Sequence, residues 1–565
     1  MKKLIALLLA LVMVLGMFAA CTPSDGGASS ESTPNTPPET PAVESESPLV
    51  IQWDQATGTD RFEPPYKDNS LSYHTHFLWS SLCNIDQSKE KDDPSRVVYD
   101  LAEKFEWSAD DLSVTITIRD DAKWHDGEAV TTEDLAFTIW ANVVDPISTA
   151  KGGWDKVVGY EALSNGEATE LEGVKVVDDH TITITRTEPL AEWMPNFQVL
   201  PAHCFEGVAA EDLSTHAYWD NPIGSGPYKI TSVNCPDGFT MTRNDDYYGK
   251  KPGIKNVTAI SIEAAGSDAA VAAVIAGDVD ITTRTVTSAG PIASNICKQN
   301  ADCVSKAMYS NNIRSFVFNM GQRTDGKNKD VLVNSAEARL AISLLIDEDT
   351  IAQYVAADAC KVMGNPNNAN TTHELDDANK SLDVDKAKSL LDAAGWDYNT
   401  EIDMLDYYGD TVVAGVFEII KADFAKAGVK MNHVNVAGMA NLGDVLYTDR
   451  NWDLMFYQAG NSDENPGAAL GMLKAESWTF MYPNTAIVEK YLGLQSAIDT
   501  NVYGTQAYTD AVHAIQKANY EDTLIIPVYV NSTVIVYNAA HIYVPDTAFD
   551  FYDNVLDLDQ WIMLK

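Results

Sequence analysis

The chain contains 565 residues, 45% of them hydrophobic, and this length predicts at least two separate hydrophobic cores. A formal net charge of -43 repels the phosphates of nucleic acids and the anionic headgroups of lipids, so the composition argues against nucleic-acid binding. The seven cysteines form no CxxC pair and no Cys/His cluster at zinc-finger spacing, so we expect neither a metal site nor a cofactor.

The first 20 residues have the pattern of a secretory signal peptide. Two lysines precede an apolar run over 4–17, which is shorter than a membrane-spanning helix, and small residues stand directly before Cys21. This arrangement resembles the lipobox of bacterial lipoproteins, and the resemblance implies that Cys21 is acylated and anchors the mature chain. An ordinary signal peptide followed by a coincidental cysteine is the alternative.

Residues 21–48 are expected to form the lipid anchor and a tether. Nearly all of them after Cys21 are Pro, Ser, Thr, Gly, Asn or acidic. Such a tract cannot bury enough apolar surface to fold, so it predicts a flexible link between the membrane and a globular body.

The periodicity of apolar residues beyond the tether predicts strands that alternate with helices. Strands are expected over 49–53, 112–118 and 181–185. Helices are expected over 132–143, 267–276, 335–347, 384–394, 415–427 and 507–520. This alternation predicts an α/β protein, and no further apolar run is long enough to span a membrane.

The most distinctive motif lies between residues 101 and 135. The segment Ala122–Glu128 reads AKWHDGE, in which Asp126 and Gly127 predict a turn. Thr131 follows, and with Glu133 and Asp134 after it the pattern predicts a capped helix start.

Further motifs follow in a fixed order along the chain. They are PIGSGPYKI over 222–230, a segment rich in Asn, Asp and Tyr over 241–252, IAGDVDI over 275–281, RSFVFN over 314–319, DKAKSLLDAAGW over 385–396 and IIPVY over 525–529. Together with the 101–135 motif, these segments resemble the family 5 bacterial extracellular solute-binding proteins, which include oligopeptide, dipeptide and nickel binders of ABC importers. Ser225 stands where threonine is usual in that family.

The resemblance implies a type II periplasmic-binding-protein fold with two hinged lobes, a ligand cleft between them and an extra subdomain. Lobe one is expected to comprise 49–312 and 526–565, with the subdomain at about 83–221. Lobe two is expected to comprise 313–525. Closure of the two lobes around a ligand is the motion known for this class.

In peptide-binding relatives the ligand main chain pairs with a segment after the first strand and with a segment of lobe two, while an aspartate holds the α-amine. The residues at the matching positions are Trp53, Asp54, Gln55, Tyr457, Gln458, Ala459, Gly460, Asn461 and Asp463. Relatives usually carry Gly-Trp before that aspartate, whereas this chain has Gly460-Asn461. Asp463 is the candidate for the amine, and a turn-capping role for it is the alternative.

Tyr408 is a further candidate, as an apolar wall of the site, with core packing as the alternative. In dipeptide-type relatives an arginine after a strand of lobe two holds the ligand carboxylate, but the segment 404–410 contains no arginine. The length of the ligand therefore stays open.

Histidines and cysteines offer few other sites. His74 and His76 lie two positions apart in an expected helix and do not share a face, and His125 in the turn motif is interpreted as structural. Cys297 and Cys303 would close the shortest disulfide loop, but spacing leaves the pairing open.

The sequence therefore predicts a monomeric, lipid-anchored solute-binding protein on the outer face of the cytoplasmic membrane. It is expected to deliver a small molecule, a peptide, to the permease of an ABC transporter without chemical conversion. The alternatives are another solute, such as a nickel chelate or a sugar, and a secreted hydrolase. The chain has no GxSxG or HExxH motif that would favour a hydrolase.

Overall fold

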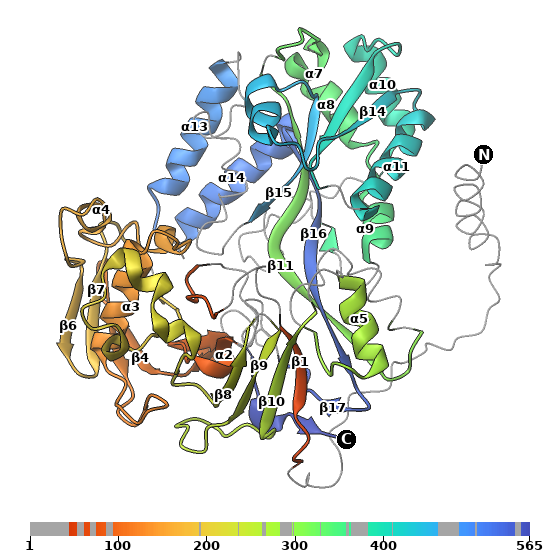
Figure 1. Cartoon of the computed structure of the whole chain (residues 1–565). Coiled ribbons are helices and arrows are strands. Elements are labelled where there is room, and N and C mark those ends of the chain that lie inside the picture. Colours follow the sequence, from red (N-terminus) through yellow and green to blue (C-terminus); the bar gives the residue numbers. More distant parts are fainter. Residues whose placement is uncertain are drawn as a thin grey trace. The chain divides into compact units, whose positions relative to one another are not determined.

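The computed structural model (Figure 1) describes most of the chain beyond residue 44. The described residues are 45–53, 61–67, 75–85, 94–190, 194–235, 237–262, 267–282, 297, 299–321, 323–327, 329–356, 361–362, 382–408, 411–460, 485–502, 505–548 and 555–564. Within these ranges, no helix combines the length and the apolar character that crossing a membrane requires.

A four-stranded sheet holds the N-terminal strand. Its strands are β1 (Leu49–Trp53), β10 (Asn256–Ser261), β9 (Gly238–Arg243) and β8 (Tyr228–Asn234), in that spatial order. β1 runs parallel to β10, and the other neighbours are antiparallel. Aromatic and aliphatic side chains from these strands form one buried cluster together with residues from the C-terminal end of the chain.

A second four-stranded sheet carries its own core. Its strands are β4 (Ala102–Trp107), β5 (Ser113–Ile118), β7 (Thr181–Thr185) and β6 (Val174–Asp178), in that order. Inward and outward residues alternate along β5 and β7, as a sheet with one buried face requires. Helix α3 (Thr132–Val144) contributes Leu135 and Ile139 to the same core. The main-chain N–H of Thr131 donates to Asp134 at 2.9 Å, as the predicted helix start requires.

A six-stranded mixed sheet organises the rest of the chain. Its strands, in spatial order, are β12 (Lys361–Val362), β16 (Ile525–Asn538), β11 (Cys303–Phe318), β15 (Leu454–Gly460), β13 (Glu401–Asp406) and β14 (Lys430–Asn435). Its helices are α7 (Asp330–Asn334), α8 (Ala336–Ser343), α9 (Glu348–Ala356), α10 (Val384–Ala394), α11 (Thr411–Lys426), α13 (Thr485–Asp499) and α14 (Gln506–Asp522). Sheet and helices share one large apolar cluster.

Two long antiparallel strands connect these cores. β11 has 16 residues and β16 has 14, and Figure 1 shows them running side by side, in green and blue. Phe316 and Ile526 belong to the large cluster, whereas Ile535 and Tyr537 belong to the cluster under β1. The register of the ladder shifts between Tyr309 and Ile313. A single pair of strands therefore spans two hydrophobic cores.

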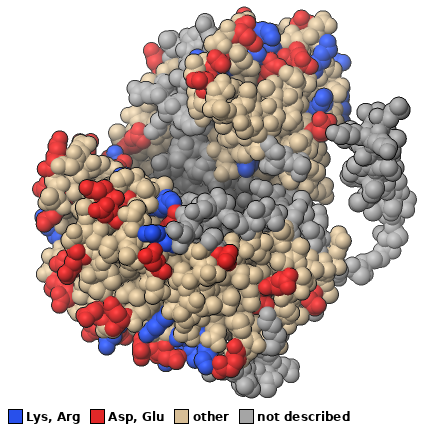
Figure 2. All heavy atoms as spheres, viewed as in Figure 1, with Lys and Arg blue, Asp and Glu red and all other residues tan. Residues whose placement is uncertain are grey.

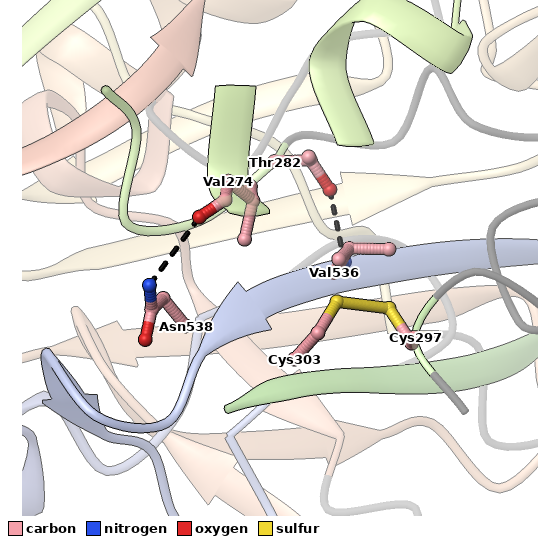
Figure 3. Close-up of a disulfide and its surroundings, with 6 residues drawn as sticks. All are labelled: Val274, Thr282, Cys297, Cys303, Val536 and Asn538. Carbon is pink, nitrogen blue, oxygen red and sulfur yellow. Dashed lines mark hydrogen bonds between the residues drawn. A yellow bond between two sulfur atoms is a disulfide. The ribbon is translucent and has the colours of Figure 1, made fainter. Parts of the chain in front are cut away.

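The N-terminal end of β11 is joined to a short loop by a disulfide between Cys297 and Cys303, the pair with the shortest loop in the sequence (Figure 3). Nearby, Thr282 Oγ1 accepts a hydrogen bond of 2.9 Å from the main-chain N–H of Val536 on β16. Asn538 Nδ2 donates to the carbonyl of Val274 on α5 (Ser267–Ala276) at 3.3 Å. These contacts attach the ladder to the core near β1.

Smaller elements complete the described structure. They are α2 (Thr75–Leu78), β2 (Cys83–Ile85), β3 (Val97–Tyr99), α4 (Tyr160–Ser164), β17 (Ile542–Tyr543) and β18 (Ile562–Met563). Acidic side chains are spread over the face drawn in Figure 2, as the net charge of -43 predicts.

The predicted strands and helices are present, and two boundaries differ from the prediction by more than two residues. The helix expected over 335–347 ends at Ser343, and α9 starts at Glu348. Asp347 explains the break, because its carboxylate accepts hydrogen bonds from the main-chain N–H and the hydroxyl of Thr350, at 3.0 and 2.7 Å, as a helix cap does. The helix expected to begin at 415 begins at Thr411 instead.

Candidate ligand-binding site

Some predicted ligand residues lie at strand ends, and others lie outside the described residues. Trp53 is the last residue of β1, at the edge of its sheet, and its register partner on β10 is Ser261. Tyr457, Gln458, Ala459 and Gly460 form the C-terminal part of β15. Asp54, Gln55, Asn461, Asp463 and the predicted lipidation site Cys21 lie outside the described residues.

The C-terminal part of β15 has a strand on one side only, among the described residues. Its residues from Leu454 to Gly460 pair with β11. On the other side, β13 pairs with Leu454 and Met455 and then ends at Asp406. From Phe456 onward, no described strand continues the ladder on that side. Unpaired main-chain groups at such an edge can bind an extended peptide as an added strand.

Tyr407 and Tyr408 follow β13 directly beside this edge. Their rings stack with centroids 4.4 Å apart, and the hydroxyl of Tyr408 donates to that of Tyr407 at 3.0 Å. The ring of Tyr408 also meets Phe456 of β15 edge to face, at 6.0 Å. Burial raises the pKa of Tyr408 above its usual value, so its hydroxyl stays protonated and keeps its hydrogen bond to Tyr407.

Asp406 fixes the position of Tyr408. Its carboxylate is fully buried, and it accepts a hydrogen bond of 3.0 Å from the main-chain N–H of Tyr408. Asn435 Nδ2 donates to both carboxylate oxygens, at 2.9 and 3.0 Å, and His433 Nε2 contacts one of them. Burial alone would raise the pKa of Asp406, but the hydrogen bonds from His433, Asn435 and Tyr408 outweigh it and lower the pKa below its usual value. The carboxylate is therefore ionised and rigidly held.

Arg314 of β11 completes this group of side chains. It was not among the ligand-binding residues predicted from the sequence. Its guanidinium carbon lies 3.8 Å from the ring centroid of Tyr408, in a cation–π contact. In the ladder, Arg314 is the register partner of Gln458. The structure therefore brings together Arg314, Tyr408 and Gln458, two of which were predicted. An arginine inside an otherwise apolar strand motif was the available signal.

The side chain of Tyr457 is more deeply buried than that of its neighbour Gln458. Its side chain is only 2% exposed and belongs to the large core cluster, whereas Gln458 is partly exposed. Ser315, the register partner of Tyr457 on β11, is fully buried as well. A ligand contact by Tyr457 would therefore use its main chain.

His125 is structural, as interpreted from the sequence. Its Nδ1 accepts a hydrogen bond of 3.0 Å from the main-chain N–H of Gly224, and its Nε2 lies 3.0 Å from the carbonyl of Gly226. Burial lowers the pKa of His125 to about 4, which keeps the ring neutral at pH 7. The imidazole thus joins the AKWHDGE turn to the PIGSGPYKI segment.

The side chain of His76 accepts a hydrogen bond. The amide of Gln198 donates to Nε2 of His76 at 3.3 Å, and burial lowers the pKa of His76 to about 4. His74 lies outside the described residues.

Asp126, His203 and Cys204 bring three possible metal ligands within 4.8 Å of one another. Burial raises the pKa of Cys204 to about 11, so its thiol is protonated at neutral pH, and a metal bound there would have to displace this proton.

Comparison with known proteins identifies the family. Residues 96–480 match the model of the bacterial extracellular solute-binding proteins, family 5, and the chain belongs to this family. The family consists of solute-binding proteins and not of enzymes. A Brucella ovis protein with the name "Putative ABC transporter peptide-binding protein" is 28% identical over 385 residues, which cover 66% of this chain and 64% of the relative. The dipeptide-binding protein DppE of Bacillus subtilis is 31% identical over 200 residues, 34% of each chain.

Solved structures show the same fold. The peptide-binding protein AppA of Clostridium difficile superimposes with a TM-score of 0.71 at 16% identity, covering 92% of this chain and all of that one. The murein tripeptide-binding protein MppA in its unliganded open form gives a TM-score of 0.68 at 19% identity, with 92% and 98% coverage. NikZ of Campylobacter jejuni, in complex with Ni(L-His), gives 0.63 at 19% identity, with 91% and 99% coverage. The α/β fold is therefore that of family 5 periplasmic binding proteins.

Proposed function

We propose that this protein captures a peptide outside the cytoplasmic membrane and delivers it to the permease of an ABC importer. The observation that carries the proposal is the edge of β15 from Phe456 to Gly460, which has a described strand on one side only. A peptide main chain can complete such a ladder whatever its side chains are, and neighbouring groups then select its ends. Relatives that bear the names of peptide-binding proteins support this choice.

The proposed site lies between two lobes, 49–312 with 526–565 and 313–525. The β11–β16 ladder supports this division, because it is the covalent and hydrogen-bonded link between the two largest cores and its register shifts between Tyr309 and Ile313. An interrupted ladder is a natural place for bending. We propose that this segment is the hinge, and that closure brings the Trp53–Gln55 segment and the β15 edge onto the same peptide.

Asp463 is the proposed partner of the peptide α-amine. A charge-assisted hydrogen bond of this kind contributes about 1.5 to 3 kcal/mol, so its loss weakens binding by about tenfold or more. Asp463→Asn is therefore expected to weaken peptide binding, whereas Asp245→Asn, at an exposed site paired with Arg243, leaves it unchanged. Equal affinities of Asp463→Asn and the native protein would remove Asp463 from the site.

Cys21 is the proposed membrane anchor, and residues 22–48 the tether. The lipobox-like sequence supports acylation of this thiol. In a bacterial host, Cys21→Ser is expected to move the protein from the membrane fraction to the soluble extracytoplasmic fraction without changing peptide affinity. Retention of the Cys21→Ser variant on membranes would reject this anchor.

A thermal-shift screen tests the proposed ligand class. A peptide that binds only the folded state at one hundred times its dissociation constant stabilises the protein by about 2.7 kcal/mol. We expect shifts with peptides, and we expect mass spectrometry to recover the bound peptide intact, which a hydrolase would not allow. Shifts with nickel chelates or sugars, and none with any peptide, would replace the peptide assignment with that solute.

A further inference from the structure

We propose that Arg314 receives a carboxylate of the bound solute, so that the site selects ligands that carry this group close to the β15 edge. The inference rests on the proposed function, since it names a chemical feature of the ligand of the same site. For a peptide, the carboxylate is the C-terminus or an acidic side chain. The segment 404–410 contains no arginine, and Arg314 of β11, two strands away in the sheet, contacts Tyr408 of that segment.

Two donor atoms of Arg314 have no acceptor, although the guanidinium also hydrogen-bonds the side chain of Tyr408. Its Nε and Nη1 are shielded from solvent, and neither has a hydrogen-bond partner. A shielded donor without a partner costs about 1 to 3 kcal/mol, and more when the group is charged. An arrangement with this cost is retained where an acceptor arrives from outside the chain, and a carboxylate matches the planar guanidinium in both charge and shape.

The surroundings of Arg314 differ from those of Arg323, Arg119 and Arg243. Arg323 contacts three carboxylates within 2.9 Å, and Arg119 and Arg243 contact one each, at 2.5 and 3.0 Å. Arg314 forms no ion pair with any described residue, although acidic residues outnumber basic ones by 82 to 39. Among the described residues, therefore, no carboxylate neutralises this guanidinium, and an external anion can take that role.

Neighbouring groups hold the guanidinium in place. Tyr408 covers one face of it at 3.8 Å, and the main-chain N–H of Tyr408 is in turn fixed by the buried carboxylate of Asp406 at 3.0 Å. Gln458, the register partner of Arg314, starts the last three residues of the β15 edge. A peptide added at this edge would therefore pass beside a preorganised cation, and preorganisation reduces the entropy lost on binding.

The alternative is that Arg314 only packs on Tyr408. The two roles predict opposite effects on the ligand-free protein. If the donors of Arg314 await a ligand, Arg314→Met removes shielded unpaired donors while it keeps apolar contact with the ring. Its melting temperature should then equal or exceed that of the native protein. A melting temperature several degrees lower would show a structural role and overturn the proposal, and this measurement needs no ligand.

Binding experiments test the carboxylate directly. The probes are a tripeptide library with free C-termini and the same library amidated, with the best-bound tripeptide then measured by calorimetry in both forms. We expect amidation to weaken binding to the native protein by about tenfold or more. In Arg314→Gln the acid and the amide should bind equally, whereas Arg186→Gln, a control just after β7, should keep the native preference. An acid preference that survives in Arg314→Gln would overturn the inference.

The same variants separate the inference from the proposed function. If neither library binds the native protein, tripeptides are excluded as ligands, and histidine with nickel is measured next. Weaker binding of this carboxylate-bearing chelate to Arg314→Gln would support the carboxylate role of Arg314 without peptides. If tripeptides bind and their acid and amide forms bind equally to the native protein, the proposed function stands and the Arg314 inference fails.

Discussion

The imidazole Nε2 of His125 lies 3.0 Å from the carbonyl oxygen of Gly226, across 101 residues of sequence. The main-chain N–H of Gly224 completes the arrangement by donating to Nδ1, so the neutral ring both donates and accepts. Neither glycine has room for a side chain, since a Cβ on Gly224 would lie 1.7 Å from the carbonyl oxygen of Leu78, and a Cβ on Gly226 would lie 2.7 Å from that of Phe77. The AKWHDGE and PIGSGPYKI motifs, which are far apart in the sequence, therefore form one structural joint.

Loss of His125 should destabilise this joint. His125→Ala leaves the N–H of Gly224 and the carbonyl of Gly226 without their partner, and we expect the free energy of unfolding to fall by about 2 to 3 kcal/mol. His203→Ala is the control, since His203 makes a single hydrogen bond to the partly exposed Asp126 and should cost less than about 1 kcal/mol. Urea titrations of both variants provide the comparison. Equal losses would contradict the role given to His125.

The pKa of Asp100 predicts a pH dependence of stability. Burial raises its pKa to about 6, despite hydrogen bonds from Ser81 N–H and the hydroxyls of Tyr247 and Tyr248. A folded-state pKa above the unfolded value of 3.8 means that Asp100 favours folding below about pH 4, and that this contribution is lost as the pH rises through about 6.

Asp100→Asn imitates the protonated carboxyl and should remove this loss. The difference between the folded-state and unfolded-state pKa values of Asp100 corresponds to at most about 3 kcal/mol in the free energy of unfolding. The variant should therefore gain stability relative to the native protein as the pH rises from 4 to 7. Chemical unfolding at several pH values measures the difference. A difference that does not change with pH would show that Asp100 is ionised throughout this range.

The local elements were predictable from the sequence, whereas the meeting of distant side chains was not. Apolar periodicity gave β1 and α10 their bounds, because each buries one face against a core. It failed at Asp347, where a capping carboxylate interrupts an otherwise continuous helical pattern. The contact between Arg314 and Tyr408 depends on the order β11-β15-β13 in the sheet, which periodicity does not contain.

The disulfide between Cys297 and Cys303 should stabilise the attachment of the β11–β16 ladder. A loop this short restricts the unfolded chain by an amount that corresponds to about 2 kcal/mol. The double variant Cys297→Ser with Cys303→Ser should lose about that much, and a reducing agent should destabilise the native protein but not the variant. Cys204→Ser, at a cysteine that is free in the structure, is the control. Equal sensitivity of native protein and double variant to reduction would contradict this pairing.

The buried ion pair between Arg323 and Asp453 provides a variant that should affect stability alone. Asp453 Oδ1 lies 2.9 Å from Arg323 Nη1, its Oδ2 accepts from the N–H of Asp403 at 2.9 Å, and the side chain is 3% exposed. Asp453 precedes the first residue of β15, so this pair holds the end of the strand opposite to Gln458. Arg323 keeps its contacts with Asp325 and Asp403 when Asp453 is removed, but its Nη1 and the N–H of Asp403 each lose a buried acceptor, which costs about 1 to 3 kcal/mol for each group.

Asp453→Ala should therefore lower the free energy of unfolding by several times the cost of Asp121→Ala, the control at an exposed ion pair, which is expected to lose less than about 1 kcal/mol. Among folded molecules, peptide affinity should stay native, since the substitution lies away from the edge and from Arg314. Calorimetry well below the midpoint of unfolding measures this affinity. A weakened affinity with native stability would reverse the assignment and place Asp453 in the ligand-binding machinery.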